Sequence, residues 1–168
     1  MGKAQRFGDN VNTDYIIAAQ HKAASLDVRE MARHTFADID PEFASRVRPG
    51  DVVVAGRNFG CGSSRETAVH VLRALGVSAV LAISFARIYF RNAVNSGLPV
   101  LECDTTDIQQ GDEIEVDLAR SVVINHTRGT ELSVTQLPPV MRAVLAAGGV
   151  APYLKRHGDL VLPPTDPA

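Results

Sequence analysis

The residues best suited to chemistry lie in one glycine-rich stretch at residues 56–66, with the sequence Gly-Arg-Asn-Phe-Gly-Cys-Gly-Ser-Ser-Arg-Glu. Gly60 and Gly62 let the backbone take unusual dihedral angles and approach a ligand closely. Ser63 with a glutamate three residues later fits a capping box, so we expect a helix to begin at Ser63. The free N–H groups at such a helix start attract carboxylates or phosphates, and Arg65 adds a two-pronged donor. The stretch therefore predicts an anion-binding turn between a strand and a helix.

The local pattern is equally compatible with a plain structural role, in which Ser63 only caps the helix and Arg65 only faces solvent. It does not match the common nucleotide motifs. Arg65 occupies the third glycine position of a dinucleotide-binding fingerprint, and no Gly-Lys-Ser/Thr follows as in a P-loop. A nucleophile elbow is excluded because no second glycine follows Ser63 at the required spacing.

Metal ligands are scarce in this sequence. Cys61 and Cys103 are its two cysteines, too few to hold an iron–sulfur cluster, and they form no C-x-x-C pair for zinc. The acidic and amide residues from Asp9 to Asp14 lack the glycine and distal glutamate of a calcium loop. We expect lone histidines to be structural or solvent-facing, namely His34, His70, His126 and His157. We therefore expect this chain by itself to bind no metal or cofactor.

The elements that must position the glycine-rich turn follow from the apolar pattern on either side of it. Residues 51–55 and 78–83 are apolar runs that predict buried strands. Between them, a helical pattern stops at Gly76 and has one apolar face, formed by Val69, Leu72 and Leu75. A second helix is expected over residues 85–95, capped by Ser84. This strand–helix–strand–helix order implies parallel pairing of the strands.

The flanking segments predict the rest of the fold. Residues 9–24 have little periodicity and are expected to form a long loop, of the kind that is often functional. A short helix (28–34), three short strands (113–116, 121–124 and 131–134) and a last helix (138–147) follow. We expect an extended tail from about residue 157. The interpretation is one α/β domain over residues 1–168, with a mixed, partly parallel sheet that curls towards a barrel and is flanked by helices.

Composition excludes several functional classes. The net charge is -2 with dispersed basic residues, which argues against nucleic-acid and anionic-membrane partners. The longest apolar stretch, around residues 77–83, is too short to span a bilayer, and the N-terminus has no apolar signal segment. A cytoplasmic location is expected.

Separated motifs resemble one known family. The stretch Asn58–Glu66 (Asn-Phe-Gly-Cys-Gly-Ser-Ser-Arg-Glu) is similar to the swivelling domain of the aconitase superfamily. Ser84–Ile88 (Ser-Phe-Ala-Arg-Ile), then Arg91-Asn92, and before them Gly8–Ile17 (Gly-Asp-Asn-Val-Asn-Thr-Asp-Tyr-Ile-Ile), continue the resemblance in the expected order. Within that superfamily the chain is most similar to the small subunits of 3-isopropylmalate dehydratases.

This resemblance implies a hydro-lyase that works only with a large subunit, which carries a 4Fe-4S cluster. The implied reaction isomerises a hydroxy-dicarboxylate by removal and return of water, in leucine biosynthesis. Ser63 would be the base that removes a proton from carbon, Ser64 and Arg65 would hold a substrate carboxylate, and Asp14 would support the site. Arg87 and Arg91, one helical turn apart, could face the cleft together or lie on a solvated face.

The resemblance leaves the substrate's variable group open. In the family the loop after Asp14 recognises that group, and some relatives have an arginine there. This chain has no arginine before Arg29; its candidate specificity residues are His21, Lys22, Ala23, Ala24 and Leu26. The first two could pair with an anion, whereas the others could leave apolar space. Thr67, where relatives commonly have His or Gln, is expected to affect packing more than chemistry.

Alternative functions follow from the same ambiguity. A homoaconitase, a dimethylmalate dehydratase or a methylmalate/citraconate hydro-lyase would use the same chemistry on another substituent. A carboxylate-binding domain without catalysis is the alternative of a different class.

Overall fold

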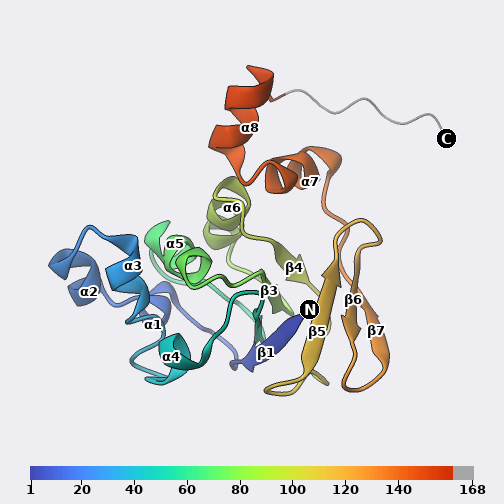
Figure 1. The fold of residues 1–168 in the computed structure, drawn as a ribbon, viewed down its shortest axis with the longest axis horizontal. Coiled ribbons are helices and arrows are strands. Elements are labelled where there is room, and N and C mark those ends of the chain that lie inside the picture. Colours follow the sequence, from blue (N-terminus) through green and yellow to red (C-terminus); the bar gives the residue numbers. More distant parts are fainter. Residues whose placement is uncertain (161–168) are drawn as a thin grey trace.

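The computed structural model describes residues 1–160, and its central feature is a seven-stranded sheet in the order β4-β3-β2-β1-β5-β6-β7 (Figure 1). The first four strands of that order are parallel to one another, and the others pair antiparallel. The strands are β1 (Gly2–Arg6), β2 (Val52–Ala55), β3 (Ala79–Ala82), β4 (Val100–Glu102), β5 (Glu113–Asp117), β6 (Val122–Asn125) and β7 (Thr130–Ser133). The expected mixed, partly parallel α/β sheet is confirmed.

Helices flank the sheet in two groups. Helices α1–α5 gather on one side of the view in Figure 1, and α6–α8 lie above the parallel strands. The helices are α1 (Thr13–Ile16), α2 (Ala19–Ala24), α3 (Val28–Ala32), α4 (Phe43–Arg46), α5 (Thr67–Ala74), α6 (Arg87–Asn95), α7 (Pro139–Ala146) and α8 (Val150–His157). No helix in residues 1–160 is both long and apolar enough to cross a membrane.

Burial explains why the central strands are uninterrupted apolar runs. Every residue of β2 and β3 is buried, because helices and neighbouring strands cover both faces of the parallel half. In contrast, β5 and β7 each have exposed residues, as expected where one face of an antiparallel sheet meets water. The chain after β7 then returns to the opposite edge strand, where the Thr135 N–H donates to the Glu102 carbonyl at 2.9 Å. The sheet therefore curls so that its two edges meet.

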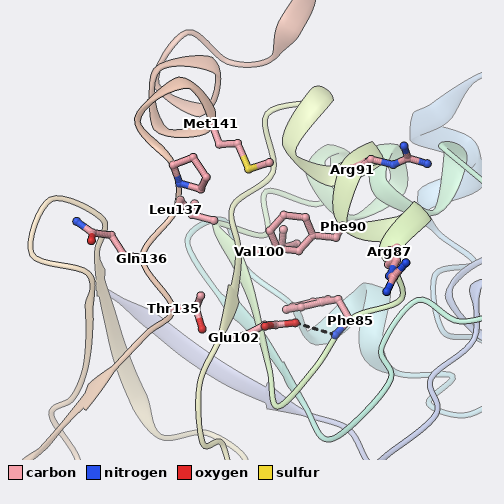
Figure 2. Close-up of a pocket in the computed structure, with 11 residues that line it drawn as sticks. Phe85, Arg87, Phe90, Arg91, Val100, Glu102, Thr135, Gln136, Leu137 and Met141 are labelled. Carbon is pink, nitrogen blue, oxygen red and sulfur yellow. Dashed lines mark hydrogen bonds between the residues drawn. The ribbon is translucent and has the colours of Figure 1, made fainter. Parts of the chain in front are cut away.

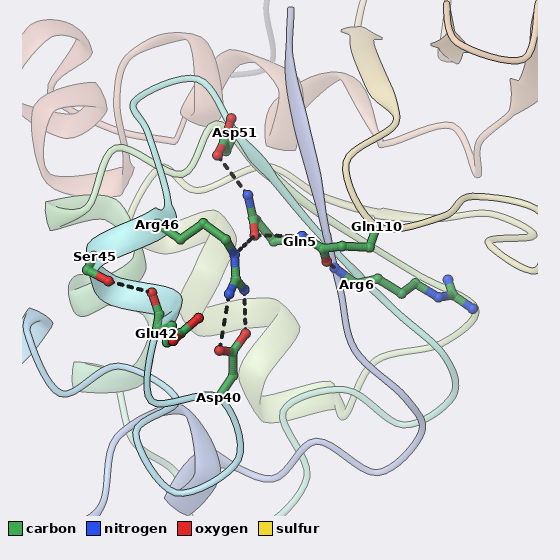
Figure 3. Close-up of polar contacts among 8 residues, drawn as sticks. All are labelled: Gln5, Arg6, Asp40, Glu42, Ser45, Arg46, Asp51 and Gln110. Atoms are coloured by element: carbon green, nitrogen blue, oxygen red, sulfur yellow. Dashed lines mark hydrogen bonds and ion pairs between the residues drawn. The ribbon is translucent and has the colours of Figure 1, made fainter.

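Buried polar groups fasten the first strand to its neighbours (Figure 3). Gln5, 3% exposed, donates from Nε2 to Asp51 at 2.9 Å and accepts from Arg46 Nε at 3.1 Å. Arg46 also forms an ion pair with Asp40, which fixes the loop around α4. Gln110 Nε2 donates to Gln5 Oε1 at 3.1 Å. These contacts satisfy the hydrogen-bonding groups of the buried Gln5 side chain. Gln5 belongs to β1, a strand that the apolar pattern of the sequence did not predict.

Several boundaries differ from the prediction. The expected loop over residues 9–24 contains α1 and α2, because Asn12 caps α1 by accepting from the Tyr15 N–H at 2.8 Å. Helix α7 is not the last one. Gly148 and Gly149 separate it from α8, which ends at the left-handed Gly158. The expected extended tail falls mostly on residues 161–168, outside the described residues.

Candidate active site

The candidate site lies where the parallel strands end. The segment Phe7–Thr13 follows β1, the glycine-rich turn follows β2, and Ser84–Ala86 follows β3. Because β1, β2 and β3 are parallel, their carboxyl ends share one edge of the sheet. Ligands of open α/β sheets commonly bind at that edge. The three sequence motifs are thereby brought together by topology alone.

Backbone hydrogen bonds join the N-terminal segment to the glycine-rich turn. The Gly60 N–H donates to the Val11 carbonyl at 2.8 Å, and the Thr13 N–H donates to the Cys61 carbonyl at 2.9 Å. Asn12 and Cys61 form a parallel bridge between these two bonds. The two segments therefore behave as a short extension of the β1–β2 pair beyond the sheet.

The segment after β3 holds the other side of the turn. The Phe59 N–H donates to the Ser84 carbonyl at 3.0 Å, and the Ala86 N–H donates to the Phe59 carbonyl at 2.9 Å. Ser84 was expected to cap α6, but the N-cap of this helix is Ala86. The Ser84 hydroxyl instead accepts the Asn58 N–H at 2.9 Å, which commits it to the turn.

One glycine of the turn is required by close packing. Gly60 has φ +77°, and a Cβ placed there would lie 2.1 Å from Cγ of the buried Tyr89. Gly62 also has a positive φ, +100°, with Thr13 Oγ1 3.3 Å from the position of a Cβ. Any side chain at residue 60 would displace the Tyr89 ring. Gly60 is thus needed for the close packing of the turn against α6, in addition to the ligand contact that the sequence predicts.

Ser63 does not cap a helix, contrary to the prediction. Helix α5 begins at Thr67, its N-cap is Glu66, and no side-chain capping bond forms. Instead of starting the helix, Ser63 forms a bend, in which its carbonyl accepts a hydrogen bond from the Thr13 hydroxyl at 3.1 Å. The Ser63 side chain is exposed, and within residues 1–160 its hydroxyl has no hydrogen-bond partner. Like the side chain of the exposed Ser64, that of Ser63 therefore faces solvent.

Arg65 forms an ion pair rather than facing solvent. Its Nη1 lies 2.5 Å from Asp14 Oδ1 and donates to the Ile17 carbonyl at 3.3 Å. The Arg65 side chain is 17% exposed and the Asp14 side chain 51%. The structure thus brings together the predicted residues Ser63, Ser64, Arg65 and Asp14. The Ile17 carbonyl was missed, because a backbone acceptor leaves no signal in the sequence.

The expected specificity segment forms α2 and its connection to α3. The Ala23, Ala24 and Leu26 side chains are exposed, with Leu26 97% exposed, and none of the three lines the pocket described below. The half-buried His21 ring stacks on His34, with ring centroids 4.0 Å apart and planes 3° apart. His34 was expected to be structural or solvent-facing, and this stack is a structural contact. The Lys22 side chain lies outside the described residues.

Arg87 and Arg91 lie at the rim of one pocket of about 570 Å³ (Figure 2). Its lining is mainly apolar and includes Phe85, Phe90, Val100, Leu137 and Met141. The pocket adjoins the glycine-rich turn, because the Phe85 ring packs edge-on against Phe59 at 6.0 Å. Sequence analysis named the two arginines but missed the apolar wall, whose residues come from three separate segments.

Neither cysteine belongs to a metal-binding cluster in residues 1–160. That part of the chain contains no group of three His, Cys, Asp or Glu side chains placed to hold a metal ion. Burial raises the pKa of the Cys103 thiol to about 11, with a further contribution from the nearby Asp104 carboxylate. A thiol in this state is protonated at neutral pH and is a poor metal ligand.

Comparison with known proteins agrees with this geometry. Residues 6–106 match the family described as the aconitase C-terminal domain. The chain is 49% identical to 3-isopropylmalate dehydratase small subunit 2 of Archaeoglobus fulgidus, over 95% of this chain and 97% of that protein. It is 44% identical to small subunit 1 of Thermotoga maritima, over 94% and 96%. A crystal structure of 3-isopropylmalate dehydratase from Methanocaldococcus jannaschii superposes with a TM-score of 0.90 at 43% identity, covering 94% of this chain and 93% of that one.

Proposed function

Since the chain belongs to the aconitase C-terminal domain family, we propose that it is the small subunit of a hydro-lyase that interconverts 2- and 3-isopropylmalate in leucine biosynthesis. We propose further that residues 1–168 form one swivelling domain and that the enzyme is cytoplasmic. Relatives named as small subunits of 3-isopropylmalate dehydratase, 44–49% identical over nearly their full lengths, support the assignment.

The observation that carries the proposal is the arrangement of Ser63 beside the Arg65–Asp14 pair. An unbonded hydroxyl stands at the carboxyl edge of the sheet, two residues from a guanidinium that a carboxylate holds in place. Two of the donors of that guanidinium, Nη2 and Nε, make no hydrogen bond within the described residues. They can receive a substrate carboxylate while Nη1 stays on Asp14.

This chain's part of the chemistry is proton transfer and positioning. Dehydration removes a proton from one carbon and hydroxide from its neighbour, and in this proposal Ser63 Oγ takes the proton. Its alkoxide needs stabilisation, for which the Arg65 guanidinium and the nearby backbone N–H groups are suited. On rehydration the same hydroxyl returns a proton to carbon. Arg65 and Ser64 fix the substrate so that this proton faces Ser63.

The second half of the chemistry belongs to a partner. A four-iron cluster needs a set of cysteine thiolates, and the two cysteines of this chain do not fit that requirement. We therefore place the cluster on a large subunit, where it would supply the Lewis acid for the hydroxyl group. The small-subunit names of the relatives support such a partner.

Substrates with another variable group remain alternatives within the same chemistry. The exposed Ala23, Ala24 and Leu26 favour an apolar branch such as isopropyl, whereas His21 or Lys22 would be needed to pair with a third carboxylate. Homoaconitase, dimethylmalate and methylmalate/citraconate activities correspond to these other groups. A domain that binds carboxylates without catalysis is a separate alternative.

The test is turnover by the chain reconstituted with its large subunit. We expect the pair to hydrate and dehydrate isopropylmalates, followed by the ultraviolet absorbance of the unsaturated intermediate. Ser63→Ala should lower kcat by at least a hundredfold, since loss of a general base costs about 10²–10⁴. Ser45→Ala, another exposed serine, is the control. Near-normal turnover by a folded Ser63→Ala complex would exclude Ser63 as the base, and an inactive parent complex would favour the non-catalytic alternative.

A further inference from the structure

The pocket beside α6 has features that the proposed chemistry of Ser63 does not use. The apolar wall of Phe85, Phe90, Leu137 and Met141 is open to solvent at a rim that carries Arg87 and Arg91 (Figure 2). An open pocket lined mainly by apolar side chains with a few polar groups is a typical binding surface. The pocket is therefore a candidate docking site.

The charge of the rim specifies part of that occupant's chemistry. Arg87 and Arg91 are exposed, and in the described part of the chain neither guanidinium has a hydrogen-bond or ion-pair partner. Glu102 is the one carboxylate of the lining, and its Oε1 accepts the Phe85 N–H at 3.3 Å. The rim is thus cationic, and it is complementary to a carboxylate.

Exposed apolar side chains favour a macromolecule over a small ligand. Ile88 lies between the two arginines in sequence and is 43% exposed. Tyr15, next to Asp14, is 42% exposed, and Leu26 is 97% exposed. Ile88 does not line the pocket, so a small molecule that filled the pocket would leave this apolar side chain uncovered, whereas a protein segment docked on α6 could cover both.

We propose that the pocket and its arginine rim receive a segment of the large subunit that presents a carboxylate beside apolar side chains. This inference rests on the proposed function, which requires the large subunit to cover Ser63. This segment anchors the partner next to the glycine-rich turn. The pocket residue Phe85 contacts Phe59 of that turn, and the Ala86 N–H donates to the Phe59 carbonyl. Docking at α6 thereby sets the position of the partner relative to Ser63.

Binding of the purified large subunit to this chain tests the proposal. The variants are Arg87→Glu/Arg91→Glu for the rim and Met141→Glu for the apolar wall. Arg73→Glu is the matched control, because α5 runs to the opposite edge of the sheet, where the Gly76 carbonyl accepts the Gly50 N–H. Each dissociation constant is measured by sedimentation or calorimetry at several salt concentrations, and folding is checked by thermal melting.

We expect the double variant to raise the dissociation constant at least tenfold and to reduce its salt dependence. Met141→Glu should also weaken binding, whereas Arg73→Glu should stay within twofold of the parent. Unchanged dissociation constants for the first two variants would overturn the proposal. So would an unchanged constant together with a raised KM for 3-isopropylmalate, since the arginines would then bind substrate. The proposed function is judged separately, by turnover in the parent complex.

Discussion

Arg65 Nη1 lies 2.5 Å from Asp14 Oδ1, although the three short helices α2, α3 and α4 and the strand β2 lie between the two residues in sequence. The Ile17 carbonyl accepts from the same nitrogen, so one face of the guanidinium is occupied by the segment that follows β1. This pairing makes Asp14 a positioning residue for Arg65. Substitutions at either residue can test separately the proposed role of the pair in substrate binding and its contribution to stability.

We expect Arg65→Lys and Asp14→Asn each to raise KM for isopropylmalate about tenfold or more, because lysine lacks the planar fork and asparagine lacks the charge that orients it. The free energy of unfolding should change by less than about 1 kcal/mol, since half of the Asp14 side chain is exposed. A double-mutant cycle on KM checks the coupling. Strictly additive effects would show that Asp14 does not act through Arg65.

Gly60→Ala should destabilise the chain by about 3 kcal/mol or more. Two costs add, the left-handed backbone of an L-residue and the overlap of the new Cβ with the Tyr89 ring. Gly129→Ala is the control, because Gly129 also has a positive φ, +66°, but nothing within 4 Å of a Cβ. It should cost about 1–2 kcal/mol. Equal losses in denaturant unfolding would mean that the turn and α6 can separate without penalty.

The Asp112 carboxylate, 5% exposed, predicts a pH dependence of stability. Burial pushes the pKa of Asp112 upward, but the Gln109 N–H, the Asn125 amide and the Arg128 guanidinium outweigh it and hold the pKa below its ordinary value. A carboxyl group whose pKa falls on folding stabilises the fold above its unfolded pKa, roughly 3.9, and loses that contribution as pH drops through the folded pKa.

Asp112→Asn should therefore cost about 1–3 kcal/mol at pH 7, where these hydrogen bonds involve a charged acceptor. The difference from the parent should shrink as pH falls below roughly 4. Urea unfolding at a series of pH values measures it. A difference that stays constant from pH 7 to pH 3 would contradict the assignment.

Leu26→Ser tests the specificity segment. The side chain is 97% exposed, so the free energy of unfolding should change by less than about 0.5 kcal/mol. If Leu26 meets the isopropyl branch in the assembled enzyme, kcat/KM for 3-isopropylmalate should fall about tenfold, the size expected for a lost apolar contact. Ile39→Ser, at a position 43% exposed and outside this segment, is the control. Equal kcat/KM values for the two variants would show that Leu26 does not contact the variable group of the substrate.

Half of the parallel sheet was predictable from the sequence. The uninterrupted apolar runs of β2 and β3 and the apolar face of α5 each predict an element without help from the rest of the chain, whereas β1 and β4 were not predicted. The strand β1 was missed because it is short and carries the polar residues Lys3, Gln5 and Arg6, and its existence depends on pairing with β2 and β5. Strand formation here is a tertiary effect rather than a local preference.

The site was predictable in its residues but not in its contacts. The resemblance named Ser63, Arg65 and Asp14 together, and the structure brings them to one edge. The capping box at Ser63 was wrong because Thr13, distant in sequence, binds the Ser63 carbonyl and delays α5 to Thr67. A pattern of four neighbouring residues cannot reveal a hydrogen bond from a residue 50 positions away. Their catalytic roles remain predictions.

The backbone bonds between Val11–Thr13 and Gly60–Cys61 also constrain how the site can open. Amide groups joined in this way exchange with solvent only when both strands of the pair separate, so the Asp14 segment and the Ser63 turn form one mechanical unit. A hinge confined to either segment would have to break the extension of the β1–β2 pair. We therefore predict that the two segments move together, and that the Gly60 and Thr13 amides exchange slowly with solvent throughout turnover.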